Sequence, residues 1–507
     1  MITHRALSLI AFSAFATHLS AASCESLASL ALPNTGITLA QTIAAGTFTA
    51  PNGSPIPNLP SFCRVAGAIR PAEDSLIAFE VWIPSTGWNG KFYGIGNGGY
   101  AGSIGYGALA TAVRHGYAAA STDTGHTGSG EPNASWALGH PQKIIDFGYR
   151  AIHETAVKAK AVIAAFYGSA VQHSYFNSCS NGGRQALMEA ERYPEDYDGI
   201  VAGAPAYYWT HLLTEAVWDA QALLGEPGAY IPATKIPAVE KAALAACDAA
   251  DGITDGVIDD PSRCHFDPSP LLCKGADDNS CLTAPQLAVL RKLYDGPGPR
   301  INPGHAPGGE GGFGGWPAWV TGSAPEKSLG FMFGTQFFKN MVYQDAAWDY
   351  HTFDAARDSK KADEKMAHIL NATDADLKPF ARRGGKLILY HGWSDAAIPP
   401  YSTIDYYNRV EAKLKPKETD SFVRLYMAPG VQHCGGGPGP NTFDMNPAIE
   451  AWVEQGAAPA AIVATRPGRS RPLCPYPQVA RWKGSGSTDD AANFTCVMPD
   501  TAVTKAH

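Results

Sequence analysis

YFNSCSNGGR, residues 175–184, decides the fold. Residues 175–178 are typical of a strand, and a helix-forming run follows at residues 183–192. Ser180 therefore lies on a tight turn between a strand and a helix. Such a turn lifts a serine hydroxyl above the edge of a parallel sheet, where it can act as a nucleophile. Ser178 stands two residues earlier, where these turns usually have Gly, but it is small enough to keep the turn feasible.

Strand and helix patterns alternate on both sides of this turn. The further candidate strands are residues 77–83, 91–94, 117–121, 199–202, 386–390 and 422–427. Apolar residues at helical spacing occupy residues 147–166, 401–414 and 447–454. This alternation predicts an α/β fold, in which a parallel sheet carries helices on both faces.

The composition changes in the middle of the chain. Residues 204–375 contain an Asp-rich loop, closely spaced cysteines, clustered aromatic residues and a Gly/Pro stretch at 296–315. The simplest arrangement is one α/β catalytic domain, residues 23–203 and 376–507, interrupted by an inserted lid domain, residues 204–375.

The first 22 residues are typical of a signal peptide. Arg5 precedes a short apolar stretch at residues 6–16, and Ser20-Ala21-Ala22 supplies small residues for cleavage. We therefore expect a mature chain that starts near Ser23 and is secreted or periplasmic. No other apolar run is long enough to span a membrane. The formal net charge of -8, without long runs of like charge, does not suggest a nucleic-acid partner.

Two further segments supply partners for Ser180. The strand at 386–390 leads into Asp395, and the strand at 422–427 leads to His433. The chain order Ser, Asp, His is that of α/β-hydrolases. A serine needs a histidine to remove its proton, and an aspartate fixes the histidine tautomer. His391 is an alternative base, which we expect instead to pack at the end of its strand.

An oxyanion hole needs two N–H donors close to the nucleophile. The N–H of Asn181, directly after the serine, is one candidate. The glycine-rich turn GIGNGGYAG, residues 94–102, follows an early strand, and we expect the N–H of Gly99 to be the second. As a dinucleotide-binding pattern this turn is weak, because no suitably placed acidic residue follows it.

All ten cysteines follow the expected cleavage site, which favours disulfides in an exported protein. Spacing pairs Cys247 with Cys264, Cys273 with Cys281, Cys474 with Cys496 and Cys24 with Cys63, and leaves Cys179 for Cys434. Other connectivities remain open, because sequence alone does not fix pairing. A bond between residues 179 and 434 requires Cα atoms about 4.4–6.8 Å apart and would bring Ser180 and His433 together. It could equally be a general crosslink that happens to lie nearby.

Five motifs together resemble the tannase/feruloyl esterase family, which also includes mono(hydroxyethyl) terephthalate hydrolases. They are CSNGGR (179–184), DGIVAGAP (198–205), YHGWSD (390–395), HCGGGPG (433–439) and RPLCPYP (471–477). The similarity covers the chain from about Cys63 to Cys496. It implies an α/β-hydrolase fold with a large lid, a triad of Ser180, Asp395 and His433, and a disulfide beside the triad.

The lid contains CDAADGITDGVID, residues 247–259. Ca²⁺ binds six to eight oxygens from carboxylates and backbone carbonyls. The candidate ligands are the side chains of Asp248, Asp251 and Asp255 and the carbonyls of Ile253 and Val257. The loop is not an EF-hand, and by itself a solvated acidic turn would be the ordinary interpretation. The family resemblance implies structural Ca²⁺ here.

The lid is also expected to set specificity. Candidates for an aromatic-ring pocket are Trp319, Phe331, Phe333, Phe337 and Phe338, although each could pack in the core instead. Lys327 is a candidate partner for a substrate carboxylate.

The resulting hypothesis is a secreted serine carboxylic-ester hydrolase that acts on small aromatic acid esters from plant cell walls, most plausibly feruloyl (hydroxycinnamoyl) esters. A tannase acting on gallate esters and a mono(hydroxyethyl) terephthalate hydrolase are the nearest alternatives. From another class, a non-catalytic calcium-dependent carbohydrate-binding protein on a hydrolase fold remains an alternative, against which an intact triad argues.

Overall fold

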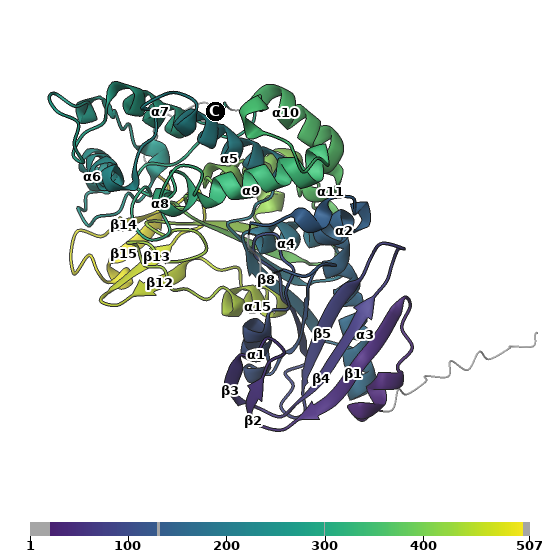
Figure 1. Cartoon of the computed structure of the whole chain (residues 1–507). Helices are drawn as coiled ribbons and strands as arrows, with labels where there is room; N and C mark the ends of the chain where they lie inside the picture. Colours follow the sequence, from purple (N-terminus) through teal and green to yellow (C-terminus); the bar gives the residue numbers. More distant parts are fainter. Residues whose placement is uncertain (1–20, 129–131, 299, 500–507) are drawn as a thin grey trace, which may run out of the picture.

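A computed structural model of the chain describes residues 21–128, 132–298 and 300–499 (Figure 1). Residues 1–20 of the predicted signal peptide lie outside these ranges. Among the described helices, none is long and apolar enough to cross a membrane.

One mixed sheet of nine strands forms the centre of the described part of the chain. Its order is β1-β4-β5-β7-β6-β8-β9-β10-β11. The strands are β1 (Thr35–Ile43), β4 (Phe62–Ile69), β5 (Ile77–Pro84), β6 (Lys91–Gly94), β7 (Ala118–Thr122), β8 (His173–Cys179), β9 (Gly199–Gly203), β10 (Lys386–Gly392) and β11 (Val423–Ala428). The pairs from β1 to β7 along this order are antiparallel, and those from β7 to β11 are parallel. The parallel part, from β7 to β11, is the α/β-hydrolase-type sheet that the alternating pattern predicts. The antiparallel edge differs from that prediction, because β1 and β4 were not predicted and make the sheet mixed.

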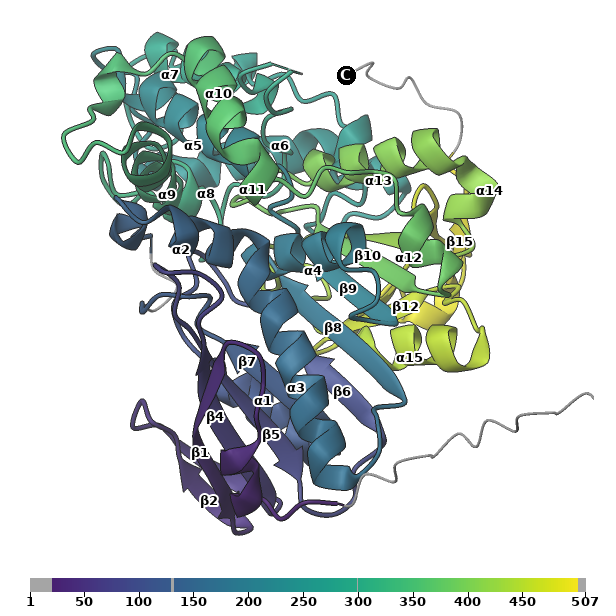
Figure 2. The same ribbon diagram turned by 90° about the vertical axis from the view of Figure 1, so that its right-hand side faces the viewer.

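Helices cover both faces of the sheet (Figure 2). One face packs against α3 (Ala151–Tyr167), α4 (Asn181–Arg192) and α13 (Tyr401–Leu414), and the other against α1 (Tyr106–Arg114) and α15 (Asn446–Gln455). Successive side chains of β8 point to opposite faces of the sheet. Phe176 packs on the face covered by α3, α4 and α13, and Tyr175 packs on the face covered by α15. Both faces are buried, which explains why the central strands are almost continuously apolar.

The chain between β9 and β10, residues 204–385, adds no strand to the sheet within its described part. We call residues 204–375 of this segment the lid, as predicted. Its helices are α5 (Trp209–Leu224), α6 (Ile236–Cys247), α7 (Ala284–Asp295), α8 (Trp316–Trp319), α9 (Leu329–Phe337), α10 (Ala355–Ala362) and α11 (His368–Leu370). The helix that follows, α12 (Lys378–Arg382), packs Phe380 into the core of the sheet domain. Figure 1 shows the lid above the end of the sheet at which the parallel strands finish.

An aromatic cluster joins the lid to the catalytic domain. Trp209 and Phe337 of the lid pack in one buried group with Tyr100 and Phe147 of the catalytic domain. A second buried group includes residues of α6 and α7 and lies almost wholly within the lid, with Ala396 as its one member from the catalytic domain. The lid is therefore packed onto the sheet domain through its own apolar side chains.

Smaller elements complete the fold. They are α2 (Pro141–Ile145), α14 (Pro416–Thr419) and three hairpins, β2 (Gly46–Thr49) with β3 (Pro55–Leu59), β12 (Ile462–Arg466) with β13 (Arg469–Leu473), and β14 (Val479–Trp482) with β15 (Phe494–Val497). The last two hairpins lie beside the lid (Figure 1).

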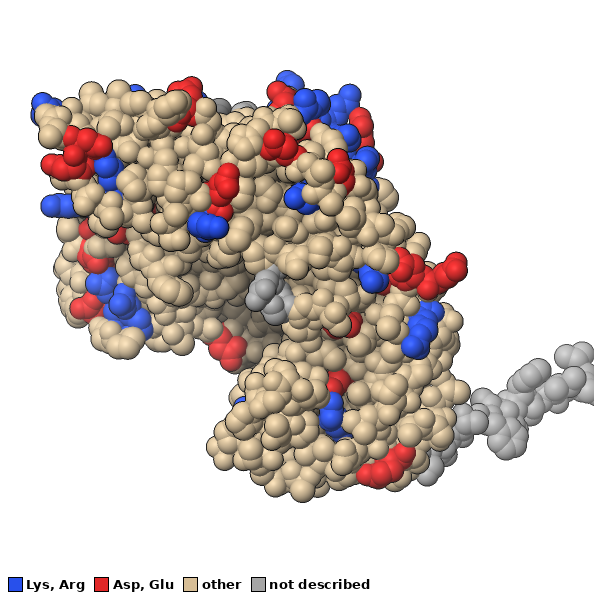
Figure 3. Space-filling view, viewed as in Figure 1, with Lys and Arg blue, Asp and Glu red and all other residues tan. Residues whose placement is uncertain are grey.

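Five disulfides are present, in the pairing that the cysteine spacing predicts: Cys24–Cys63, Cys179–Cys434, Cys247–Cys264, Cys273–Cys281 and Cys474–Cys496. Such density is typical of proteins from oxidising compartments. Charged side chains of both signs are interspersed over the face shown in Figure 3.

Candidate active site

Ser180 occupies the turn between β8 and α4, as its sequence context predicts. Its φ is +67°, a left-handed value that is strained for a residue with a side chain. The glycines that follow allow α4 to start close to the sheet. A Cβ on Gly183 would collide with the carbonyl oxygen of Gly203, and one on Gly182 would collide with the Ser178 hydroxyl. The sequence SNGG is thus needed for the tight strand-to-helix turn.

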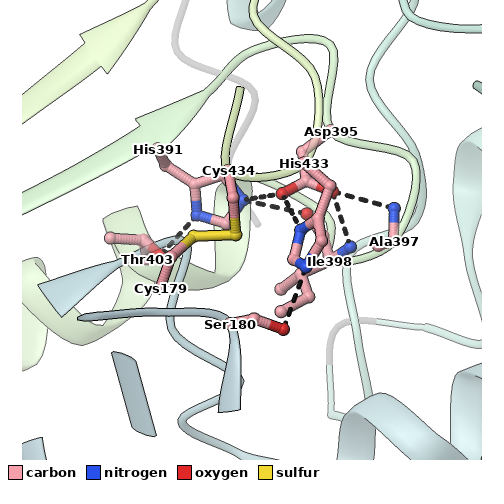
Figure 4. The surroundings of a disulfide bond; sticks show 9 residues. All are labelled: Cys179, Ser180, His391, Asp395, Ala397, Ile398, Thr403, His433 and Cys434. Carbon is pink, nitrogen blue, oxygen red and sulfur yellow. Dashed lines mark hydrogen bonds and ion pairs between the residues drawn. A yellow bond between two sulfur atoms is a disulfide. The ribbon is translucent and has the colours of Figure 1, made fainter. Parts of the chain in front are cut away.

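Ser180, His433 and Asp395 are joined by hydrogen bonds (Figure 4). His433 Nε2 lies 2.9 Å from Ser180 Oγ, and His433 Nδ1 lies 2.8 Å from Asp395 Oδ2. An ionised carboxylate can only accept, so Nδ1 carries the ring proton and Nε2 is free to accept from the serine hydroxyl. This is the arrangement in which a histidine can take the proton of a serine nucleophile.

The Asp395 carboxylate is fully buried and held as an anion. Burial alone would raise its pKa, but the charge of His433 and the hydrogen bonds from His391 and His433 outweigh burial and hold the pKa well below its usual range. Its second oxygen, Oδ1, accepts from the backbone N–H groups of Ala397 (2.8 Å) and Ile398 (3.0 Å).

His391 lies against Asp395, which the sequence did not reveal. Its Nε2 is 3.1 Å from Asp395 Oδ2 and 3.0 Å from the Ile398 carbonyl oxygen. Both partners are acceptors, so Nε2 carries a proton, and Nδ1 at 2.7 Å can accept from the Thr403 hydroxyl. His391 is thus a fully buried donor to Asp395. Its hydrogen bonds to described residues go to Thr403, Asp395 and Ile398, whereas His433 bonds to Ser180.

The Cys179–Cys434 disulfide runs beside the triad (Figure 4). Its Cα atoms are 5.9 Å apart, and it closes 255 residues of chain. It connects the residue before Ser180 to the residue after His433, so it limits how far the two can separate.

The glycine-rich turn after β6 lies next to Ser180. Gly99 has φ +53°, and it lines the same cavity as Ser180 and Asn181. Within the described residues, no hydrogen-bond acceptor is found for the N–H of either Gly99 or Asn181. Both N–H groups are therefore available to a bound oxygen atom, which fits the predicted oxyanion hole.

This turn is fixed by contacts on both of its sides. The Gln185 side chain of α4 accepts from the Asn97 N–H at 2.9 Å, and Asn181 Nδ2 donates to the Asn97 carbonyl at 3.1 Å. On the lid side, the Tyr100 hydroxyl donates to the Phe333 carbonyl of α9 at 2.7 Å.

A cavity of about 660 Å³ opens above Ser180 and His433. The lid supplies its apolar wall: Trp209, Leu212, Leu213, Ala216, Trp319, Leu329, Gly330 and Phe333. Among the described residues that line it, His433 is the only one with a titratable side chain, and none is Asp, Glu, Lys or Arg. The cavity therefore suits an uncharged, largely apolar group.

The structure corrects part of the predicted substrate pocket. Trp319 does line the cavity, with its ring 5.3 Å from that of His433. Lys327 is instead exposed on the loop before α9 and outside the cavity lining. Phe331 also lies outside the lining, because it turns to the other side of α9 and packs edge-on against Tyr350.

The other two phenylalanines, Phe337 and Phe338, are fully buried in the aromatic cluster that joins the lid to the catalytic domain. The sequence analysis missed the contribution of α5, whose Trp209, Leu212, Leu213 and Ala216 line the cavity. Their spacing of three to four residues along a helix was the available signal.

The acidic loop at residues 247–259 wraps its backbone around carboxylates. Asp248 accepts from the N–H groups of Asp255 (3.1 Å) and Gly256 (2.9 Å), and Asp251 accepts from that of Ile253 (2.9 Å). Burial raises the pKa of Asp259, and the neighbouring carboxylate of Asp251 raises it further. Two adjacent carboxylates are a donor set that fits a hard cation. The sequence analysis did not include Asp259.

Asp255 has a second role that the sequence did not show. Its Oδ2 pairs with Arg471 at 2.7 Å and with Arg469 at 3.2 Å, both from β13. The acidic loop thereby joins the lid to the C-terminal hairpins.

Comparisons with known proteins agree with this geometry. Residues 63–497 match the family model described as Tannase and feruloyl esterase. An uncharacterised esterase of Xanthomonas campestris is 44% identical, with 96% of this chain and 94% of the relative covered. A mono(2-hydroxyethyl) terephthalate hydrolase of Piscinibacter sakaiensis is 35% identical, with 95% of this chain and 92% of the relative covered. The solved structure of feruloyl esterase B from Aspergillus oryzae has a TM-score of 0.85 at 29% identity and covers 94% of this chain and 99% of its own.

Proposed function

The chain belongs to the tannase and feruloyl esterase family, and we propose that it cleaves esters of uncharged aromatic acids, feruloyl (hydroxycinnamoyl) esters above all, with Ser180 as nucleophile. Its relatives are named as esterases, and it is a carboxylic ester hydrolase. The observation that carries the mechanism is the line of hydrogen bonds from Ser180 through His433 to Asp395.

In the first half-reaction, Ser180 Oγ attacks the ester carbonyl carbon while its proton passes to His433 Nε2. The carbonyl oxygen becomes an oxyanion, which the N–H groups of Gly99 and Asn181 stabilise. Asp395 stabilises the imidazolium formed on His433. The bond to the alcohol oxygen then breaks, the imidazolium proton goes to the departing alcohol, and the acyl group remains on Ser180.

In the second half-reaction, water replaces the alcohol. His433 Nε2 takes a proton from this water as its oxygen attacks the acyl carbonyl. The same N–H groups stabilise the second oxyanion. The bond to Ser180 Oγ breaks, the serine recovers its proton from His433, and the carboxylic acid leaves.

Replacing Ser180 by Ala tests the mechanism. We expect Ser180→Ala to fold with its hydrogen-bonded His433–Asp395 pair and to lose hydrolysis of methyl ferulate by a factor of about 10³ or more. Survival of the activity would exclude the serine mechanism. If the protein bound carbohydrate and neither form hydrolysed any ester of a broad panel, the non-catalytic alternative would hold instead.

The choice of acid rests on the charge of the cavity. A terephthalate monoester carries a free carboxylate, and a buried carboxylate without a cation or several donors is strongly disfavoured. Lys327 lies outside the cavity, and no described lining residue is Lys or Arg. The three hydroxyls of a gallate likewise need polar partners, whereas the lid wall is apolar. A feruloyl group has one phenol and one methoxy group, so it fits this wall best.

Kinetics on three substrates separate these options. We expect kcat/KM for methyl ferulate to exceed that for mono(2-hydroxyethyl) terephthalate and for methyl gallate by about tenfold or more, equivalent to about 1.4 kcal/mol of transition-state stabilisation. The control substrate is dimethyl terephthalate, the uncharged diester, because it has the same ring as the monoester but no free carboxylate. A preference for the monoester over the diester would overturn the assignment.

We also propose that the acidic loop holds a structural Ca²⁺. The candidate ligands are the carboxylates of Asp248, Asp251 and Asp255 and the carbonyls of Ile253 and Val257. In support, Asp255 uses only Oδ2 for its two arginines. The half-buried carboxylates of Asp251 and Asp259 are neighbours, and a cation would offset the repulsion between their charges. Bound Ca²⁺ would stiffen the lid and take no part in proton transfer.

Chelation tests this proposal. Treatment with EGTA, with metal loss verified by elemental analysis, is expected to lower the melting temperature, and added Ca²⁺ to restore it. Asp251→Asn is expected to lower it without EGTA. An unchanged melting temperature after verified metal loss would show that no bound ion stabilises the lid.

Export to the periplasm or the medium completes the proposal, with esters of plant cell-wall origin as substrates. The five disulfides and the signal-like residues 1–22 support export. Sequencing the mature N-terminus is expected to find it near Ser23.

A further inference from the structure

A buried group of acids and a histidine lies in the lid, apart from the triad and from the acidic loop. Glu215 and Asp219 lie one turn apart on α5, and His305 comes from the segment between α7 and α8. Their exposed fractions are 2%, 6% and 5%. One side-chain N or O atom of each lies within 4.8 Å of the corresponding atoms of the other two.

The hydrogen bonds of this group leave one atom of each residue unused. His305 Nε2 is 2.9 Å from Asp219 Oδ2, and Asn302 Nδ2 donates to Glu215 Oε2. Glu215 Oε1, Asp219 Oδ1 and His305 Nδ1 are buried and have no hydrogen-bond partner within the described part of the chain. Three unpartnered polar atoms in one buried group are unusual, because buried polar atoms are nearly always satisfied.

The charge of the group is also unbalanced. Within the described residues, Glu215 forms no ion pair, and the only ion-pair partner of Asp219 is His305. Two buried carboxylates next to one imidazole therefore need either bound protons or a cation.

We propose that Glu215, Asp219 and His305 bind a divalent transition-metal ion of the Zn²⁺ type. An imidazole nitrogen with carboxylate oxygens is a donor set that such ions prefer, whereas Ca²⁺ prefers oxygen alone. Ligand atoms about 2.0–2.2 Å from Zn²⁺ lie about 3.3–3.6 Å apart in a tetrahedron, so side-chain rotations would draw the three together. Asn302, whose amide nitrogen now donates to Glu215, could supply a fourth ligand through its amide oxygen once that side chain turns over.

A cleft gives the ion a route from solvent. It has a volume of about 590 Å³, and His305 forms part of its wall. Asp267, Asp295 and Arg291 line the same cleft, and Arg291 lies 3.9 Å from Asp267, so Asp295 is left as the acidic group that can attract a cation toward His305.

The position of the site indicates a structural role. The ion would join α5, which lines the substrate cavity, to the segment that contains His305. Three residues further along that segment, the Gly308 carbonyl accepts from the hydroxyl of Ser394, the neighbour of Asp395. The bound ion would thus fix the lid against the segment that carries the triad carboxylate.

Metal analysis of the full-length mature protein tests the proposal. Protein is first stripped with dipicolinate, then incubated with ZnCl₂ in the presence of Ca²⁺, desalted and measured by ICP-MS. We expect about one Zn per wild-type chain and less than about one fifth of that in Asp219→Asn and His305→Gln. His211→Gln is the matched control, because His211 is another buried histidine of the lid that pairs with a carboxylate, Asp363, and it should retain Zn²⁺.

A second measurement keeps the test decisive if the variants do not fold. Co²⁺ added to stripped wild-type protein should give visible absorption bands of a low-symmetry site, and Zn²⁺ should abolish them. Wild-type protein that retains less than about 0.1 Zn per chain and shows no such Co²⁺ bands would overturn the proposal. So would variants at Asp219 and His305 that fold and bind as much Zn²⁺ as the wild type; the group would then hold protons in place of a metal.

Discussion

Asp395 accepts hydrogen bonds from the rings of His433 and His391 and from the backbone N–H groups of Ala397 and Ile398. The pKa of Asp395 in the folded protein lies well below its value in the unfolded chain, which is about 3.9. Its ionised form therefore stabilises the folded protein fully at pH values above that unfolded pKa. This stabilisation is lost only as the pH falls toward the pKa of the folded state. The carboxylate therefore stays charged at every pH at which the proposed histidine base can work.

The first prediction concerns this carboxylate. Asp395→Asn keeps the shape of the side chain, but an amide N–H facing His433 favours the wrong ring tautomer, so kcat should fall by about 10³–10⁴. Steady-state kinetics on methyl ferulate check this. Asp349→Asn, at an exposed turn of the lid, is the control and should keep full activity. Loss of less than tenfold in the first variant would mean that Asp395 is not the third triad member.

The second prediction concerns His391, a positioning residue that acts through Asp395. His391→Leu removes one donor from the carboxylate, which leaves more negative charge facing His433 and stabilises its imidazolium form. We expect kcat to fall about tenfold and the acidic limb of the kcat/KM profile to move to higher pH. His391→Gln, which retains an N–H donor, should recover part of both changes. A purely structural role would lower stability in the two variants and leave the pH profile unmoved.

At the scale of elements, the turn after β6 and the lid helix α9 are coupled. Tyr100 follows Gly99 directly, and its hydroxyl donates to the Phe333 carbonyl. The same ring packs against Trp209 at 5.6 Å between centroids. The lid therefore helps to set the position of a proposed oxyanion donor as well as the wall of the substrate cavity.

The third prediction follows from that contact. Tyr100→Phe removes the side-chain hydrogen bond to the Phe333 carbonyl, at a cost of about 0.5–1.5 kcal/mol in stability. We expect kcat to fall several-fold and KM to change little. Without this hydrogen bond the turn that carries the Gly99 N–H is held less firmly, and this donor is proposed to stabilise the oxyanion and not the bound substrate. Tyr426→Phe is matched, since Tyr426 is also buried and donates to a carbonyl, that of Pro459, outside the active site. An equal fall in kcat in both variants would contradict the coupling.

The fourth prediction compares two disulfides. Loop-closure entropy assigns about 5 kcal/mol to the 255-residue loop of Cys179–Cys434 and about 3 kcal/mol to the 22-residue loop of Cys474–Cys496. Replacing both cysteines of either disulfide by serine should lower the melting temperature. The decrease should be larger for Cys179–Cys434 than for Cys474–Cys496. Only the pair at 179 and 434 should also lower kcat at temperatures where the variant is folded. Unchanged kcat in that variant would reduce the bond to a general crosslink.

Local sequence was sufficient for β5, for the parallel strands β6 to β11 and for the Ser180 turn, because each depends on neighbours in the chain. It did not indicate β1 and β4 at the antiparallel edge of the sheet. Cysteine spacing suggested the observed disulfide pairing but left other pairings open. Local sequence was insufficient where a contact depends on the lid's folded path. Lys327 and Phe331 belong to the correct segment, but the rotation of α9 directs Phe331 away from the cavity. Similarly, the arginines that neutralise Asp255 are more than 200 residues away in sequence, so no local pattern could indicate them.

At the scale of the whole molecule, buried acids make stability depend on pH. Burial, together with the nearby charge of Asp146, raises the pKa of Asp123 to about 7, although backbone N–H groups of Ala78 and Gly125 oppose this. Burial likewise raises the pKa of Glu310 to about 7. An acid whose pKa is raised by folding favours the native state in its protonated form, and this contribution disappears as the pH rises from about 4 to about 7.

The fifth prediction uses these two acids. We subtract the melting temperature of Asp123→Asn from that of the wild type at each pH. This difference should decline between pH 5 and pH 8, because the wild-type carboxyl loses its proton in this range whereas the amide of the variant cannot ionise. Glu310→Gln should show the same trend, and the double variant should show roughly the sum of the two. Thermal denaturation across this range provides the measurement. A constant difference between wild type and variants over the range would mean that these carboxyls remain ionised in the folded protein.

The Cys179–Cys434 bond also bears on how the protein matures. During synthesis Cys179 appears long before Cys434, and Cys247, Cys264, Cys273 and Cys281 emerge in between. If an oxidase joined cysteines in their order of appearance, it would link Cys179 to Cys247 and displace every lid pair. The native set therefore depends on a thiol that is protected, or on a wrong bond that is reshuffled, until Cys434 has been synthesised. In the export compartment that we propose, a disulfide isomerase would then limit the yield of active enzyme.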